Sequence, residues 1–128
     1  MQVPLKLRIV AGQYAVARLP ADSSIPAWAS GPGFSAVIRA DDELTVVCSE
    51  DRVPAEIEAE CGWICLRTMG PFDFQATGIV RSLVEPLSAN GIGVFVVCTF
   101  NGEHLLVSTK DSQKAQGLLI AAGHQFID

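Results

Sequence analysis

The sequence predicts an α+β fold made of two tandem copies of one β-α-β-β-α-β unit, and three observations lead to this prediction. Residues 33–51 fall on residues 93–111 when the chain is shifted by 60, and their apolar positions coincide. Each copy has the pattern of a strand, a tight polar turn, a second strand and a helix start. With 49 % hydrophobic and 18 % charged residues, this chain of 128 residues can build a core. We place the N-terminal unit at 1–61 and the C-terminal unit at 62–128.

The first half of the C-terminal unit is predicted as a strand, a loop and a helix. Residues 62–69 alternate and are rich in β-formers, which favours a strand. Residues 77–91 carry apolar side chains at helical spacing. We expect Asp73 or Thr77 to cap the start of this helix and Asn90-Gly91 to end it. Pro86 is expected to bend or break its last turn.

The second half of this unit is predicted as a hairpin, a helix and a strand. Residues 93–100 and 103–109 form the hairpin around Asn101-Gly102, the dipeptide most typical of two-residue turns. Residues 111–123 form a helix that Asp111 caps and Gly123 stops. Residues 124–127 close the unit as a strand. This order is that of the split-βαβ, or ferredoxin-like, unit.

The N-terminal unit is predicted as a shortened version of the same order. Its strands are expected at 14–20, 34–40, 43–49 and around 63–67, with one helical turn at 25–30 and a second helix at 51–59. Residues 5–10 remain as an extra strand, joined to the next one through a turn at 11–13.

Composition excludes several classes of protein. The chain has 9 basic and 14 acidic residues and a net charge of −5, so we expect no nucleic acid as the main partner. No apolar stretch has the roughly 20 residues that cross a bilayer, and the first residues do not resemble a secretory signal. We therefore expect a cytoplasmic protein with no membrane partner.

The cysteines and histidines do not form a pattern typical of a metal or catalytic site. Cys48, Cys65 and Cys98 lie in apolar runs and are expected as buried thiols, and disulfides are the less favoured alternative. A C-x3-C pair and two isolated histidines fall short of two tight pairs of zinc ligands. No nucleophile motif or phosphate loop occurs. The sequence predicts neither an enzyme, nor a metal site, nor a cofactor.

The segment from Gly70 to Val107 resembles the ACT domain, the amino-acid-sensing regulatory module. More narrowly, the chain is similar over its whole length to small bacterial tandem-ACT proteins, the subfamily that also builds the CASTOR-type arginine sensor. The most specific piece is the strand-turn-strand that usually has the pattern S-T-[FY]-x-T-D-[YFH]-x-L-V, which residues 98–107 follow as CTFNGEHLLV. Glutamate replaces the usual aspartate there, and glycine replaces the second threonine.

The chemistry of a free amino acid defines what such a site must offer. Its carboxylate needs accessible backbone N–H groups, which Gly78 and Gly93 can provide, and its ammonium needs an acid, which Glu103 supplies. By the resemblance, the backbone of Gly93 and Val94 holds the carboxylate, while other residues hold the amine and side chain across an interface. These are the loop from Asp73 to Gly78, with Thr77, and the following Ile79, together with Thr99, Phe100 and Glu103.

Each of these residues also has a purely structural interpretation. The glycines can serve packing, Thr99 is an ordinary strand residue, Phe100 can belong to the core, and Glu103 can be a solvated turn residue. The sequence predicts a non-catalytic protein that binds a small molecule, most simply an amino acid, at an ACT–ACT interface of a homodimer. The alternative is a protein–protein interaction module with a vestigial pocket, whose protein partner the sequence does not identify.

Overall fold

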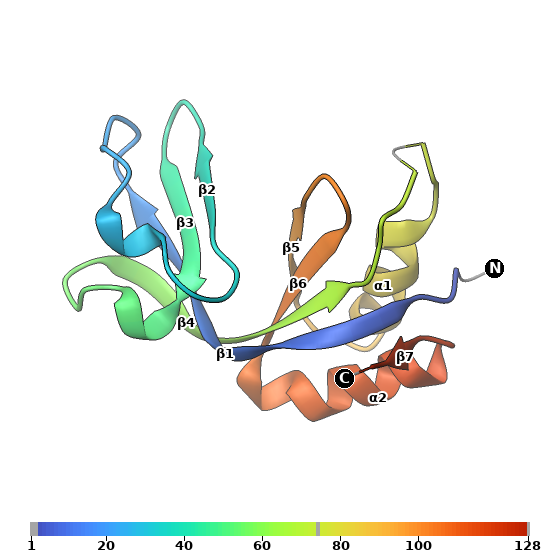
Figure 1. Ribbon diagram of the computed structural model, residues 1–128. Helices are drawn as coiled ribbons and strands as arrows, with labels where there is room; N and C mark the ends of the chain where they lie inside the picture. Colours follow the sequence, from blue (N-terminus) through green and yellow to red (C-terminus); the bar gives the residue numbers. More distant parts are fainter. Residues whose placement is uncertain (1–2, 74, 128) are drawn as a thin grey trace. The chain divides into compact units, whose positions relative to one another are not determined.

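The computed structural model describes residues 3–73 and 75–127, and it combines strands with two α-helices (Figure 1). The α-helices are α1 (Ile79–Ser88) and α2 (Ser112–Ala121), and single 3-10 turns occur at η1 (Ala27–Ala29), η2 (Glu50–Arg52) and η3 (Thr109–Asp111). The strands are β1 (Lys6–Leu19), β2 (Ala36–Arg39), β3 (Leu44–Ser49), β4 (Glu58–Thr68), β5 (Phe95–Cys98), β6 (Glu103–Ser108) and β7 (Gln125–Phe126). The mixed α/β fold is consistent with the ferredoxin-like prediction.

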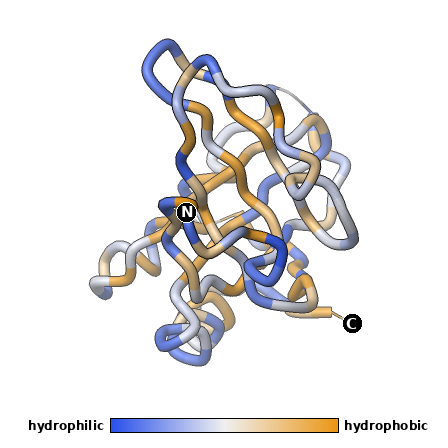
Figure 2. The backbone as a smooth tube through the Cα atoms, turned by 90° about the vertical axis from the view of Figure 1, so that its left-hand side faces the viewer, coloured by the Kyte–Doolittle hydropathy of each residue, from blue (hydrophilic) through white to orange (hydrophobic). Residues whose placement is uncertain are grey.

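The chain forms two compact units. Unit 1 combines the chain up to Val10 with the residues from Ile64 onward, and unit 2 is Ala11–Trp63. The long strands β1 and β4 therefore contribute to both units. Figure 2 shows hydrophobic stretches along the extended parts of the backbone tube and hydrophilic stretches at several of its bends. In the described part of the chain, neither α-helix combines the length and apolar character that crossing a membrane requires.

The core of unit 1 lies between its strands and the two α-helices. Leu83 and Leu87 of α1 and Leu119 of α2 are fully buried against Leu66 of β4 and Leu105 of β6. The apolar spacing of 79–87 thus packs one face of α1 onto the sheet, as the sequence predicted. β5 pairs with β6 in antiparallel orientation, and β7 pairs with the start of β1 in parallel orientation.

Helix α1 begins differently from the prediction. Its N-cap is Gly78, with φ 82° and no side-chain cap hydrogen bond, so the expected caps Asp73 and Thr77 were wrong. Glycine is favoured there because the backbone is left-handed. Pro86 lies inside the helix near its end, and Gly91, with φ 78°, follows the last turn, where the Ile92 N–H donates to the Leu87 carbonyl at 3.0 Å.

Strand β1 is continuous where a turn was expected. The predicted break at residues 11–13 was wrong, although Gly12 has φ 94° within the strand. The reason is that both halves of the strand have partners of their own. Lys6 and Leu7 pair with β7, and Tyr14 to Leu19 pair with β3.

Unit 2 contains no α-helix among its described residues, and the helix expected at 51–59 was wrong. The chain makes only the 3-10 turn η2 and then becomes extended at Val53, with ψ 122°. The proline at 54 disfavours the helical conformation of the residue before it. Arg52 instead donates from Nε to the Trp28 carbonyl at 3.1 Å and from Nη1 to the Pro32 carbonyl at 3.2 Å.

The hairpins of the two units have the same register and the same loop closure. Ala36 faces Val47 in unit 2 and Phe95 faces Leu106 in unit 1, so paired positions lie 59 residues apart. The Ala40 N–H donates to the Glu43 carbonyl at 2.9 Å, and the Thr99 N–H donates to the Gly102 carbonyl at 2.7 Å. The expected shift of 60 was therefore one residue too long, and the two-residue turn at Asn101-Gly102 is a four-residue loop.

Candidate functional site

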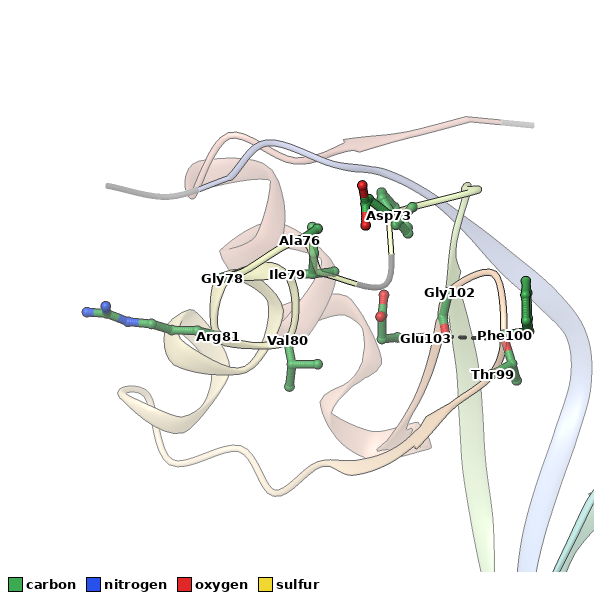
Figure 3. Close-up of a pocket in the computed structure, with 11 residues that line it drawn as sticks. Asp73, Ala76, Gly78, Ile79, Val80, Arg81, Thr99, Phe100, Gly102 and Glu103 are labelled. Carbon is green, nitrogen blue, oxygen red and sulfur yellow. Dashed lines mark hydrogen bonds between the residues drawn. The ribbon is translucent and has the colours of Figure 1, made fainter.

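A cavity of about 250 Å³ opens in unit 1 between the loop after β4, the first turn of α1 and the loop of the β5–β6 hairpin (Figure 3). Two stretches that are distant in sequence, residues 72–81 and 99–103, thus meet at one place. The residues that line it are Phe72, Asp73, Ala76, Gly78, Ile79, Val80, Arg81, Thr99, Phe100, Gly102 and Glu103.

Six of the nine residues proposed from the sequence line this cavity. They are Asp73, Gly78, Ile79, Thr99, Phe100 and Glu103. The other three do not. Thr77 is an exposed neighbour of Gly78, and Val94 packs against the core of unit 1. Gly93 is exposed, and a Cβ atom added there would meet nothing within 4 Å, so crowding does not require glycine at this position.

The charged residues of the cavity are two acids and one paired base. Oδ1 of Asp73 accepts a hydrogen bond from the Gln75 N–H at 2.8 Å, so this carboxylate shapes its own loop. Arg81 is 77 % exposed in its side chain and forms an ion pair with Glu85 at 3.1 Å. In Figure 3 its side chain extends away from the other lining residues. The remaining acid is Glu103, so the cavity favours a ligand with a positively charged group.

Residues at the start of α1, from Gly78 to Arg81, line the same cavity. The opening N–H groups of a helix have no partner within the helix, and the N-cap residue Gly78 has no side chain to bind them. The first hydrogen bond of the helix runs from the Ser82 N–H to the Gly78 carbonyl at 2.9 Å. Unhindered N–H groups at a positive helix end are suited to a carboxylate. The site therefore offers groups of opposite polarity to a small zwitterion.

Sequence reasoning missed Thr68, which lies at the end of β4. Its side chain is buried, and its hydroxyl is 3.2 Å from Oε1 of Glu103. The available signal was a polar residue closing an apolar strand, but only the pairing of β4 with β6 brings it next to Glu103. Phe72, Val80, Arg81 and Gly102 also line the cavity and were missed, whereas Ala76 falls within the predicted loop from Asp73 to Gly78.

Two titratable groups near the hairpin are held neutral. Partial burial and then the negative charge of Glu103 raise the pKa of the Cys98 thiol. Burial and then the charge of Arg67 lower the pKa of His104 to about 4. Cys98 is exposed, so its expected burial was wrong, and Cys61 is exposed as well. Among the described residues, no three metal-ligating side chains come together.

Two protein families match successive parts of the chain. Residues 12–56 match a family described as an N-terminal domain. Residues 58–120 match the ACT domain family, so the ACT domain expected from the resemblance is confirmed. No curated protein matches the chain.

Solved structures resemble the whole chain. Protein Atu0741 from Agobacterium tumefaciens is 50 % identical, with a TM-score of 0.93 over 98 % of this chain and 93 % of that one. VC0802 from Vibrio cholerae, a protein of unknown function described as a possible transport protein, is 19 % identical, with a TM-score of 0.73 over 88 % and 85 %.

Aspartokinases resemble the fold at lower identity. The Clostridium acetobutylicum aspartate kinase, described as an allosteric enzyme, is 14 % identical, with a TM-score of 0.68 over 95 % of this chain and 35 % of that one. Aspartokinase III from E. coli, in complex with aspartate and ADP, is 11 % identical, with a TM-score of 0.62 over 91 % and 32 %. At these identities the likeness concerns the fold alone.

Proposed function

We propose that this chain, which belongs to the same family as Atu0741 and contains an ACT domain, is a non-catalytic regulatory protein that binds a free amino acid in the cavity of unit 1. The observation that carries the proposal is the meeting of Glu103 with the uncapped first turn of α1 in one small cavity. The ACT domain and the fold shared with allosteric aspartokinases support a regulatory role for this binding.

The proposed orientation of the ligand follows from the charges and dipoles of the groups that line the cavity. The ligand carboxylate binds the backbone N–H groups at the start of α1, where the helix dipole favours negative charge. The ligand ammonium binds the carboxylate of Glu103. The side chain of the ligand lies toward the apolar lining, which includes Ile79, Val80 and Phe72. A volume of about 250 Å³ is below the roughly 300–1,000 Å³ of pockets for drug-sized molecules, so it suits a metabolite of amino-acid size.

We extend the proposal to the whole chain as a tandem-ACT protein that acts as a cytoplasmic homodimer. The common spacing of 59 residues and the common loop closure of the two hairpins support a duplication in which unit 2 is a shortened copy. Phe100 is 77 % exposed and Val80 is 39 % exposed at the cavity. Large apolar side chains at a cavity mouth favour coverage by a further ACT unit, which places the ligand at an ACT–ACT interface. A dimer in light scattering is the expected result, and a monomer would contradict this part.

A thermal-shift screen with the twenty standard amino acids tests the binding function. A saturating ligand stabilises the folded state, by about 2.7 kcal/mol at a concentration of 100 times Kd, so the melting temperature should rise. We expect one or a few amino acids to give this rise in the unmodified protein. Glu103→Gln should reduce it, because the ammonium loses its negatively charged partner.

The matched control is Glu56→Gln, which removes the same charge from an exposed position of unit 2. It should leave the response unchanged. A flat response of the unmodified protein to the whole panel at millimolar concentration contradicts the proposed function.

The second candidate function is a protein–protein interaction module. The exposed ring of Phe100 at the tip of the β5–β6 hairpin favours it. This alternative predicts a partner that binds without any amino acid and that is lost with Phe100→Ser. The amino-acid screen separates the two functions, because the interaction module shows no change in melting temperature with any amino acid.

A further inference from the structure

The hydroxyl of Thr68 contacts both the backbone and the carboxylate of Glu103. Thr68 Oγ1 accepts a hydrogen bond from the Glu103 N–H at 2.9 Å. It lies 3.2 Å from Oε1 of the Glu103 carboxylate and 3.5 Å from the Glu103 carbonyl oxygen. A hydroxyl has one proton to donate, and the shorter contact with the charged acceptor is the stronger one. Thr68 therefore accepts from the main chain and donates to the carboxylate of the same residue.

The surroundings hold this hydroxyl in place. The Thr68 side chain is 2 % exposed, so its rotamer is fixed by packing rather than by solvent. A Cβ atom added to Gly102 would come within 2.6 Å of Thr68 Oγ1. Only a glycine lets the hairpin loop approach the hydroxyl this closely. Gly102 and Thr68 together thus allow the loop of the β5–β6 hairpin to pack closely against the end of β4.

We infer that Thr68 is a positioning residue for ligand recognition, which holds the Glu103 carboxylate in the orientation that meets the ligand ammonium. Figure 3 shows the Glu103 side chain directed into the space between the start of α1 and the loop that carries Asp73. An unrestrained glutamate loses rotamer entropy when it is fixed by a ligand, and a carboxylate held in advance avoids part of this loss. This inference rests on the proposed function, because it names a residue that prepares the same site.

The test compares two substitutions of Thr68 in the full chain by calorimetric titration with the amino acid that gives the largest thermal shift. Thr68→Val keeps the shape of the side chain and removes the hydroxyl, so it should weaken binding about 10-fold or more. Thr68→Ser restores the hydroxyl and should bind within about 2-fold of the unmodified protein. Thr45→Val makes the same chemical change in unit 2 and should leave the affinity unchanged.

A double-mutant cycle separates positioning from a general structural effect. If Thr68 acts through the Glu103 carboxylate, Thr68→Val should have no further effect on affinity in a Glu103→Gln protein. The inference would be overturned if Thr68→Val weakened amino-acid binding equally in the unmodified protein and in Glu103→Gln. It would also be overturned if Thr68→Val alone bound with full affinity.

A ligand-free measurement keeps this inference distinct from the proposed function. Three-bond couplings in the NMR spectrum report the side-chain rotamers of Glu103 without any ligand. We expect one dominant rotamer in the unmodified protein and in Thr68→Ser, and several in Thr68→Val. If no amino acid binds, the proposed function fails, and these couplings alone decide whether Thr68 fixes Glu103. Identical rotamers in all three proteins would overturn the inference.

Discussion

Gly102 shows how a single residue determines the shape of the candidate site. It is buried, and its missing side chain is what allows the Thr68 hydroxyl to approach the hairpin loop. From the sequence, Gly102 was noted as part of an Asn-Gly turn and as a replacement of the motif's second threonine. Its effect on the site depends on the close approach of Thr68 in the neighbouring strand β4, and the local sequence does not reveal this contact.

Replacing Gly102 with alanine should lower the free energy of unfolding. The new Cβ atom would stand 2.6 Å from Thr68 Oγ1, and relieving such overpacking typically costs about 1–3 kcal/mol. Gly93→Ala is the matched control, because a Cβ atom there meets nothing within 4 Å. Denaturation by urea measures the free energy of unfolding of both variants. Equal stability of the two variants would show that the loop does not need to approach Thr68 so closely.

His104 should make the stability depend on pH. Its folded-state pKa is about 4, because burial and the charge of Arg67 disfavour the protonated ring, whereas an unfolded histidine has a pKa near 6.5. Between these values the unfolded state binds a proton that the folded state does not. Stability is therefore fully present above about pH 6.5 and falls by up to roughly 3 kcal/mol as the pH drops to about 4.

Urea denaturation at several pH values measures this effect. The unmodified protein should lose more stability between pH 6.5 and pH 4 than a His104→Leu variant, which lacks the titrating ring. Parallel pH curves for the two proteins would contradict the buried, neutral state of His104.

At the scale of elements, His124 connects three parts of unit 1. Its Nδ1 accepts from the Leu5 N–H at 3.1 Å, so the ring proton sits on Nε2, which donates to the Ser82 carbonyl at 2.8 Å. The Ser82 hydroxyl in turn donates to the Val3 carbonyl. The chain before β1, helix α1 and the residue before β7 are thus linked through buried and partly buried hydrogen bonds.

Removing the ring should loosen this connection. His124→Phe leaves the buried Leu5 N–H without its acceptor, which typically costs about 1–3 kcal/mol of stability. The amide of Leu5 should also exchange with solvent faster, and this can be measured by NMR. Unchanged exchange at Leu5 together with unchanged stability would contradict the role of His124. Gln125→Ala, an exposed neighbour, is the control and should leave both unchanged.

Elements with a strong local pattern were predictable, and elements that depend on distant partners were not. The apolar stripe of α1 and the two hairpins follow from spacing and turn residues. The unbroken strand β1 depends on its pairing with β3 and β7. The helix wrongly expected at 51–59 is a different case, because the proline at 54 was a local signal against it. A shift of 60 instead of 59 exchanges the two faces of every strand in the comparison, so the apparent coincidence of apolar positions between 33–51 and 93–111 was misleading.

The same distinction applies to the site. The motif in residues 98–107 located the hairpin loop, and glycine chemistry located the start of α1. Thr68 and Phe72 enter only when β4 is placed beside β6, which no local pattern specifies. The sequence identified Glu103 as the acid of the site, but it did not identify Thr68, whose hydroxyl contacts the Glu103 carboxylate.

At the scale of the whole molecule, the ACT domain supplies a small cavity with two acidic side chains, and residues 11–63 form a second compact unit. A ligand can regulate such a protein only through different affinities for two arrangements of the molecule. The regulatory proposal therefore depends first on whether a zwitterion binds at Glu103.

The most direct measurement is a calorimetric titration with an amino acid from the screen and with its analogue that lacks the amino group. We predict that the amino acid binds with a dissociation constant in the millimolar range or below and that the deaminated analogue binds at least about 10-fold more weakly. Glu103→Gln should remove this difference. Equal binding of the two compounds, or a preference that persists in Glu103→Gln, would contradict recognition of an ammonium group by Glu103.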